Sequence, residues 1–511
     1  MDVRKSLAVC VYVNTAIAVA LSLYFFLIPA GELVWDLRDP GLRSGQAPRF
    51  AFRWHRALSP KYERWARARV QSGEAAQLST RDIAGTEWPL FGSVFYLWAT
   101  EALQEAAQEN PGLCRTPPNQ YARGAIEAAA ALVADPGHAG WVKKHWGEDY
   151  LEHENLFYRM LLISALTSYQ KLLADAKYEE LLRRQVESLA KELDESPHGL
   201  LDDYPGQCYP VDIVPAIAAI RRADAVLGTD HSQFVARAIR GFQDDRLDRH
   251  TGLPAYVVDS RTGRAEDSAR GVGLSFILTW APQLWPQTAQ DWYARYEQQF
   301  WQEGLFFAGF REFPKDIDVG WLNMSDVDAG PIVAGYGVAA SAFGVGAARA
   351  MGRMDHAHKL AAQALVASWP LPGGTLLVPR VLSNVSDAPY LGEAATLFAL
   401  TRRPVVQAQS GAKLRLPMIV YLGVLALLAL GICEIAASVL KLRRWRRGES
   451  RRCVPRPRLQ ALAWCILLAC AGITGAAFSR WIALIFLLAV LILPWQRKRP
   501  ADEAAQTRGA E

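Results

Sequence analysis

The chain has 511 residues, of which 51% are hydrophobic and 21% are charged, and its formal net charge is +5. The positive charge is concentrated in residues 441–458, which hold nine Lys or Arg and one Glu, so the long stretch 31–415 is acidic overall. A nucleic-acid-binding surface needs clustered basic residues on the folded domain. The composition therefore argues against nucleic acid as a partner.

The N-terminal segment 1–30 predicts a transmembrane anchor. Residues 7–28 carry no charge and are long enough to span a bilayer. Arg4 and Lys5 precede them, and no small-residue cleavage site follows, which favours an uncleaved anchor over a signal peptide.

Further apolar stretches near the C-terminus predict additional spans. Segment 411–440 predicts one transmembrane helix, and segment 459–496 predicts a transmembrane helical hairpin that turns near Arg480. Between them lies the basic loop 441–458, and a tail, 497–511, that opens with the basic residues Arg497, Lys498 and Arg499 follows. Basic flanks stay on the cytoplasmic side. We therefore expect a multi-pass protein of the inner membrane, with four spans and a periplasmic main domain.

Few cysteines fall in that extracytoplasmic region. Of the seven in the chain, only Cys114 and Cys208 lie in residues 31–410, the stretch expected outside the membrane and the cytoplasm. One disulfide between them is possible, but two cysteines do not make a disulfide-stapled scaffold.

Residues 31–85 read as a lead-in segment. Three prolines, Pro40, Pro48 and Pro60, interrupt it, and only 62–71 has the pattern of a short charged helix.

Residues 86–410 predict paired helices. The pairs expected in chain order are 92–108 with 119–133, 156–173 with 178–193, 214–227 with 232–243, 272–284 with 289–302, 332–351 with 357–368, and 391–400, which opens a sixth pair. Only the stretch 253–264 reads as two short strands around a turn.

A polar loop precedes the first helix of each pair. These loops recur roughly every 60 residues, the size of one helical hairpin with its connections. Their landmark residues are Pro89, His153, Pro210, Gly271, Gly330 and Pro389. The repeat predicts one supersecondary unit, used six times.

The first helix of each pair is richer in small residues than the second, as in 216–220 and 334–348. Small side chains suit helices packed on several sides, whereas their charged partners suit an outer face. We therefore predict an all-α fold, an (α/α)6 toroid of six helical hairpins, plus about four transmembrane helices. An open α-solenoid of the same repeats is the alternative.

In such a ring the six polar loops converge on one mouth. Acidic residues before helices, such as Asp212, Asp328 and Asp387, can be simple N-caps. The loop 202–210 exceeds what capping needs, because it contains two carboxylates, two phenols, an amide and a thiol.

We predict four catalytic residues in that loop. Asp202 or Asp203 would act as general acid and base, because a carboxyl group beside aromatic rings can have a raised pKa. Tyr204 and Cys208 would donate hydrogen bonds or transfer protons. The predicted substrate-binding residues are His153, Asn155, Tyr158, Gln207, Tyr209, Asp326 and Asp328.

Neither a metal nor another cofactor is expected. His145 and His153 have no third ligand at a recognisable spacing. For Cys208 three roles remain open: a disulfide with Cys114, inert burial, or a thiol activated by the helix start that follows it.

The runs 154–172 and 204–212 resemble the linalool dehydratase/isomerase family. The matching positions are Asn155, Tyr158 and Cys208, whereas Leu161 and Ile217 stand where that family has a histidine and a second cysteine. The resemblance implies an α/α toroid and cofactor-free hydration, dehydration or isomerisation of terpene alcohols.

Three functions follow as hypotheses. The first is a cofactor-independent lyase or isomerase acting on a small hydroxylated or lipid-like molecule. The second is a glycan-active enzyme of the cell envelope that uses paired carboxylates. The third is a non-catalytic binding or scaffolding domain. The expected partners are such a small-molecule, lipid or glycan substrate and the membrane, and the oligomeric state is left open.

Overall fold

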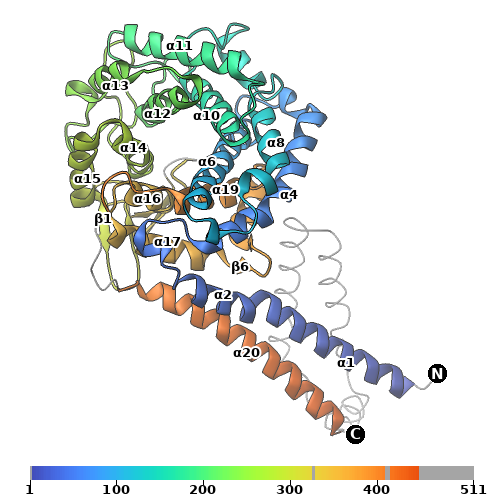
Figure 1. The fold of residues 1–511 in the computed structure, drawn as a ribbon. Helices are drawn as coiled ribbons and strands as arrows, with labels where there is room; N and C mark the ends of the chain where they lie inside the picture. The colour runs from blue at the N-terminus through green and yellow to red at the C-terminus, as the bar shows by residue number, and fades with distance from the viewer. Residues whose placement is uncertain (1–2, 325–327, 409–414, 448–511) are drawn as a thin grey trace, which may run out of the picture. The chain divides into compact units, whose positions relative to one another are not determined.

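The computed structural model describes residues 3–324, 328–408 and 415–447 (Figure 1). It is mostly helical, with 66% helix and 6% strand, which confirms the predicted all-α class. The chain forms two compact units, Pro29–Ala426 and a second unit made of Met1–Ile28 and Leu427–Glu511.

Six helices of the larger unit surround a common centre (Figure 1). They are α6 (Trp88–Glu109), α10 (Leu156–Leu173), α12 (Pro210–Leu227), α14 (Gly271–Leu284), α16 (Val338–Ala350) and α19 (Leu391–Thr401). Each packs against the next in chain order, and α19 packs against α6. The inner contacts therefore form a closed circuit.

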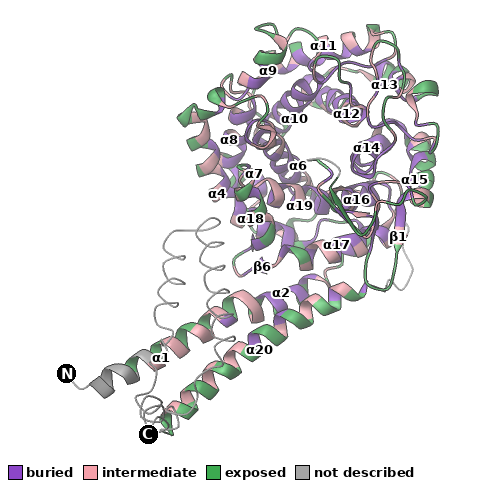
Figure 2. Ribbon diagram, turned by 180° about the vertical axis from the view of Figure 1, so that it is seen from behind, coloured by how far each residue is buried: buried purple, intermediate pink, exposed green. Residues whose placement is uncertain are grey.

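Five outer helices each pack on an inner helix of their own. They are α8 (Arg123–Val133), α11 (Glu179–Glu195), α13 (Ser232–Ala238), α15 (Pro286–Phe300) and α17 (Met354–Ser368). Figure 2 shows the inner helices buried and the outer helices exposed along one side. In α11, for example, Leu182, Val186 and Leu189 are buried, while charged residues occupy the other face.

The outer helix that flanks α19 comes from the N-terminal lead-in. This helix, α4 (Arg49–Ser72), packs on both α8 and α19. It runs through Pro60, where we had predicted a break. An interior proline costs roughly 3 kcal/mol, and the burial of residues such as Trp54 and Tyr62 on either side offsets that cost.

Aromatic side chains pack between several of the inner helices. Trp98 lies 4.4 Å from Trp280 between ring centroids, and Phe398 lies 5.1 Å from both Phe95 and Trp98. These four rings come from α6, α14 and α19, so aromatic packing joins these three inner helices.

A β-rich insertion separates α15 from α16. It contains the hairpin β1 (Trp301–Glu303) and β2 (Ala308–Phe310), and a sheet of β3 (Leu322–Met324), β4 (Pro331–Val333) and β5 (Tyr336–Gly337) in the order β3-β4-β5. All pairings are antiparallel, with Glu303 opposite Ala308 and Leu322 opposite Val333.

Two sequence predictions are wrong here. The helix expected from residue 332 begins at Val338, because Ala334 and Gly335 have φ values of 50° and 83°, which a right-handed helix excludes. The two strands expected at 253–264 are replaced by isolated bridges, such as Val258 with Ala265.

The remaining short elements connect these helices. They are α3 (Gly41–Ser44), η2 (Glu74–Gln77), α5 (Ile83–Thr86), η3 (Pro111–Leu113), α7 (Pro118–Tyr121), α9 (Gly140–Trp146), η4 (Ile239–Phe242), η5 (Asp244–Arg246), β6 (Pro370–Leu371), β7 (Thr375–Leu376) and α18 (Leu377–Val385).

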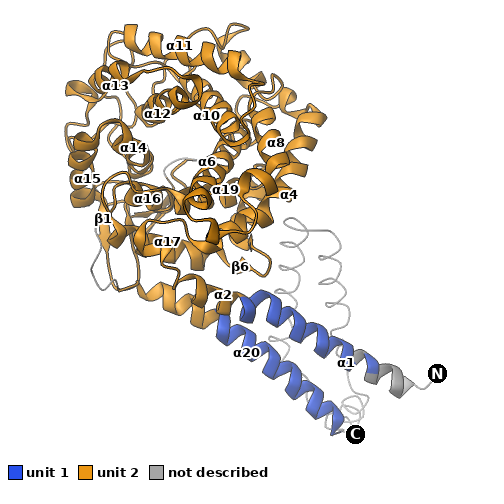
Figure 3. Ribbon diagram, viewed as in Figure 1, with its two compact units in different colours: residues 1–28, 427–511 blue, residues 29–426 orange. Residues whose placement is uncertain are grey.

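Two of the described helical runs are long and apolar enough to cross a membrane, Val11–Asp36 and Met418–Arg446. The first comprises the end of α1 (Val3–Ser22), η1 (Leu23–Leu27) and α2 (Ile28–Asp36), and the second is α20. Figure 3 shows how each run passes from one compact unit to the other. The hairpin expected at 459–496 lies outside the described residues.

Candidate functional site

Four acidic residues from three segments of the chain form a carboxyl cluster, defined here as Glu87, Asp203, Asp212 and Asp328. Asp212 interacts electrostatically with the other three, and Glu87 also interacts with Asp328. Glu87 immediately precedes α6, Asp212 lies in the first turn of α12, and Asp328 lies between β3 and β4. The starts of α6 and α12 and the β3–β4 connection therefore bring together groups that are far apart in the sequence.

Tyr204 joins this cluster through its phenol, which donates a hydrogen bond to the Glu87 carboxyl. Its ring lies 6.0 Å from that of Trp141 and 5.7 Å from that of His145. Burial raises the pKa of Tyr204, and the adjacent Glu87 raises it further. The phenol thus stays protonated and acts as a donor.

The loop that carries Tyr204 is held by its own hydrogen bonds. Pro205 and Gly206 occupy the centre of a tight turn, and the φ of 77° at Gly206 is the left-handed value that a type II turn requires. Gln207 N–H donates to the Tyr204 carbonyl at 2.8 Å, and Gly206 N–H donates to Asp202 Oδ2 at 2.7 Å. Asp202 therefore serves the turn that positions Tyr204.

Asp203 is buried, with 1% of its surface exposed. Its Oδ2 accepts a 2.8 Å hydrogen bond from Tyr209 N–H, whereas Oδ1 has no hydrogen-bond partner among the described residues. Burial raises the pKa of Asp203 well above its usual range, and Asp212 raises it further; the N–H groups of Tyr209 and Phe157 act in the opposite direction. The surroundings of Asp203 therefore favour its protonated form.

Glu87 and Asp212 are also shifted towards the protonated form. Burial raises the pKa of Glu87 to about 7, Tyr204 lowers it, and Asp328 adds a smaller increase. Burial raises the pKa of Asp212 well above its usual range, followed by the charges of Asp328 and Glu87. A carboxylic acid with a pKa near neutrality can both give and take a proton at physiological pH.

These shifts predict that the protein is more stable at about pH 5 than at about pH 8. A group with a raised folded-state pKa stabilises the fold below its unfolded pKa, and this contribution is lost as the pH rises through its folded pKa. For Glu87 the window runs from its ordinary value of 4.5 to about 7. This interval corresponds to roughly 3 kcal/mol.

Thermal melts followed by circular dichroism at both pH values test this expectation. Glu87→Gln should reduce the difference between them, because glutamine does not titrate. Glu101, whose pKa is lowered to about 2 by Arg222 and Lys171 against the effect of burial, does not titrate in this window. Equal melting temperatures of the wild type at the two pH values would contradict the assigned shifts.

Aromatic rings lie next to the carboxyl cluster. Phe91 is one helical turn after Glu87, and its ring lies 6.0 Å from that of Phe157 and 5.6 Å from that of Phe276. Phe343 lies 5.4 Å from Phe276. Phe91 and Phe343 are only partly buried. The cluster thus combines proton-transferring groups with an apolar, aromatic surface.

Cys208 is fully buried, and both it and Cys114 are free thiols, so the structure contains no disulfide between them. Burial raises the pKa of the Cys208 thiol well above its usual value, and Asp203 raises it further. Burial therefore acts against a thiol with a lowered pKa, and Cys208 is a buried free thiol in this structure.

The residues predicted from the second loop have structural partners. Asn155 takes a left-handed conformation with φ 50°, and its Nδ2 donates to the Tyr150 carbonyl at 2.9 Å. Tyr158 donates from its hydroxyl to the Val133 carbonyl at 3.0 Å, which ties α10 to α8. His153 is exposed and contacts the ring of Trp146.

The other predicted binding residues are spread over the same region. Tyr209 donates to Gln207 Oε1 at 3.4 Å, and its ring lies 5.8 Å from that of Tyr256. Asp328 belongs to the carboxyl cluster, and Asp326 lies outside the described residues.

Two residues of the carboxyl cluster were not among the predicted site residues. Glu87 belongs to the first polar loop, and Asp212 had been considered only as a helix cap. The N-cap of α12 is Tyr209, not Asp212. Both residues lie at the start of an inner helix, and this shared position was the feature of the sequence that could have identified them.

In the part of the chain that the structure describes, no three His, Cys, Asp or Glu side chains are grouped to hold a metal ion.

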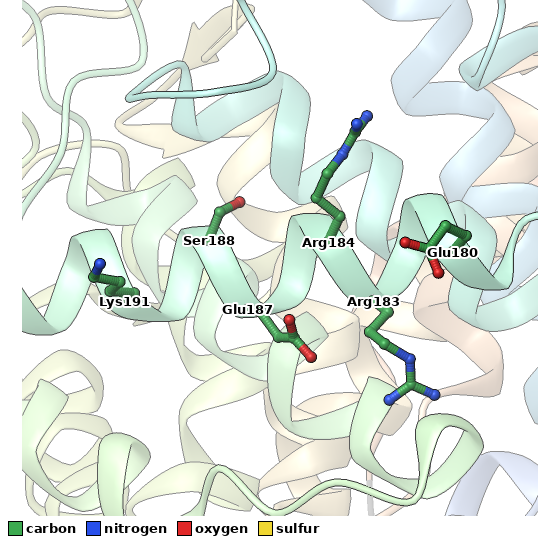
Figure 4. A pocket seen from close by; sticks show the side chains of 6 residues that line it. All are labelled: Glu180, Arg183, Arg184, Glu187, Ser188 and Lys191. Carbon is green, nitrogen blue, oxygen red and sulfur yellow. The ribbon is translucent and has the colours of Figure 1, made fainter.

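A separate hollow of about 360 Å³ lies on the outer surface of α11 (Figure 4). All of its lining residues come from this one helix: Glu180, Arg183, Arg184, Glu187, Ser188 and Lys191. Their side chains point in different directions (Figure 4), and they include both acidic and basic groups. They do not converge on a ligand position, so the hollow is not a candidate active site.

Comparison with models of protein families finds none that matches this chain, and comparison with curated proteins finds no match either.

Proposed function

We propose that this chain is a membrane-anchored enzyme of the α/α-toroid class that eliminates water from, or isomerises, a small hydroxylated apolar substrate without a cofactor. The observation that carries the proposal is the Glu87–Tyr204 pair within a carboxyl cluster beside aromatic rings. The similarity of the 154–172 and 204–212 runs to the linalool dehydratase/isomerase family supports the same chemistry.

The toroid assignment rests on the circuit of inner helices. An open solenoid has two ends, whereas here the first inner helix, α6, packs on the last, α19. The outer helix α4 packs on α19 and α8, which supplies the partner of the sixth hairpin.

In the proposed reaction the protonated Glu87 donates its proton to the substrate hydroxyl as the carbon–oxygen bond breaks, and water leaves. The carboxylate of Asp328, which is exposed, removes a proton from the adjacent carbon, and the electrons of that C–H bond form the new double bond. Asp212 interacts with both residues and relays the proton back to Glu87. The products are an alkene and water, and the enzyme returns to its initial state.

Two further features serve this reaction. The Tyr204 phenol is fixed on Glu87 and orients the carboxyl that gives up its proton. The faces of Phe91 and Phe343 would contact the alkyl part of the substrate and stabilise positive charge that develops on carbon through cation–π attraction.

We further propose that the ring is periplasmic and that the protein is multi-pass. The basic stretch 441–458 begins in the last turns of α20. The positive-inside bias assigns that end of α20 to the cytoplasm.

The test is turnover by the purified full-length protein in nanodiscs, with a panel of allylic tertiary alcohols in deuterated water. Alkene formation and deuterium incorporation, followed by gas chromatography with mass spectrometry, are expected for the wild type. Tyr204→Phe should lower both, whereas the control Asp316→Asn, which changes a carboxyl with 60% side-chain exposure, should not. Binding without turnover, or release of sugars from glycans instead, would overturn the proposal.

A further inference from the structure

The turn of the β1–β2 hairpin exposes three consecutive apolar side chains. Leu305 is 72% exposed, Phe306 51% and Phe307 44%. The turn is ordered, because Gly304 N–H donates to the Phe307 carbonyl at 2.8 Å. No charged residue lies between Gly304 and Ala308. Large apolar side chains gathered at one exposed tip usually mark an interaction site.

This tip is bonded to the beginning of the α20 membrane span. Met418 N–H donates to the Leu305 carbonyl at 3.0 Å, and Ile419 N–H donates to the Phe306 carbonyl at 3.2 Å. Both residues belong to the first turn of α20, whose leading N–H groups have no partner within the helix. These hydrogen bonds satisfy two of those N–H groups and hold the tip beside the first residues of α20.

The body of the hairpin is fixed to the ring as well. Tyr336 of β5 donates from its hydroxyl to the Phe307 carbonyl at 3.2 Å. At the base of the turn, Lys359 of α17 pairs with Glu303 at 2.7 Å. Contacts with β5 and α17 therefore hold the hairpin, and with it the tip, in place.

We infer that the Leu305–Phe307 tip inserts into the outer leaflet of the bilayer that α20 crosses. A segment held at the first residues of a membrane span lies at the depth of the lipid headgroups and the upper acyl chains. Apolar faces of interfacial segments are buried about 5–10 Å into that region. Aromatic rings are favoured there.

The end of the first membrane-spanning run carries a comparable residue. Trp35, one residue before the end of α2, is 75% exposed. Trp35 and the Leu305–Phe307 tip both belong to the Pro29–Ala426 unit. An exposed Trp at the end of a span is typical of the aromatic belt at a membrane interface. The bilayer accounts for both features, whereas a protein partner would require a separate explanation for each.

The experiment measures the depth of residue 306 in the full-length protein reconstituted in nanodiscs. A ketone-bearing amino acid introduced at Phe306 accepts a spin label and leaves all seven cysteines unchanged. We expect its collision rate with oxygen, relative to a water-soluble nickel chelate, to be several-fold higher than that of a label in water. The matched control is the same label at Val385 of α18, which is 74% exposed and equally apolar.

A label at 306 that is as accessible to the nickel chelate as the label at 385 would overturn the inference. Low accessibility to both reagents would also overturn it, because that outcome indicates cover by protein. As a second measurement, the double variant Phe306→Ser/Phe307→Ser should retain the circular dichroism of the wild type, since both side chains are exposed. None of these readouts depends on catalytic activity.

Discussion

Glu87→Gln is expected to lower kcat about 10²–10⁴-fold, the usual contribution of a positioned general acid. Glutamine keeps the size of the side chain and can still accept the hydrogen bond from Tyr204, but it has no proton to give. The loss should appear in kcat and in kcat/KM alike, because the proton is transferred only in the transition state. Steady-state kinetics with the substrate identified in the alcohol panel measure both constants.

The matched control for this substitution is Glu148→Gln, which changes a carboxyl with 84% side-chain exposure outside the carboxyl cluster. Its kinetics should equal those of the wild type. The Glu87→Gln variant should also melt at a higher temperature than the wild type at about pH 8, since it removes a carboxyl whose ionisation destabilises the fold. A fully active Glu87→Gln enzyme would rule out Glu87 as the acid.

Arg349→Met is expected to cause a large loss of stability, about 3–5 kcal/mol in the free energy of unfolding. Arg349 is fully buried in α16, and its guanidinium donates hydrogen bonds to four backbone carbonyls. The acceptors are Arg402 at 2.8 Å, Gly41 at 3.2 Å, Gly45 at 2.9 Å and Gln46 at 2.8 Å. Each buried acceptor left without a donor costs about 1–3 kcal/mol, and entering water recovers part of that.

Thermal melts of the purified variant measure the change, and Arg249→Met, at a side chain with 88% exposure, serves as the control. Because the acceptors at 41–46 lie in the lead-in, this segment should become the first site of limited proteolysis. If Arg349→Met melts within two degrees of the control, the contacts of Arg349 do not stabilise the ring.

Sequence periodicity located most of the inner helices. The landmarks Pro89, Pro210, Gly271 and Pro389 lie within two residues of the starts of α6, α12, α14 and α19. Polar turn residues followed by a long apolar run predict a buried inner helix, because an apolar helix must be covered on several sides. The helical class followed from the same pattern.

Other features depend on partners that are distant in the sequence. The helix α4 contains Pro60, and only its burial against α8 and α19 explains why it continues. The carboxyl cluster was missed for a similar reason. Glu87 and Asp328 are separated by most of the ring in the sequence, and neither residue alone differs from an ordinary surface acid. The pKa of Glu87 is raised only because folding buries this residue and brings Asp328 near it.

The contact between α6 and α19 also bears on how the domain unfolds. A linear array of repeats can lose its terminal repeat while the others remain folded. Here the last inner helix packs against the first. Local unfolding at any point of the circuit therefore exposes two apolar surfaces, so no helix can unfold first at a low cost in free energy. Bringing α6 and α19 together costs loop-closure entropy, but this cost grows only with the logarithm of the number of residues between them. The domain should therefore melt in one cooperative step without fraying, and a chain that stops before Leu391 should not fold at all.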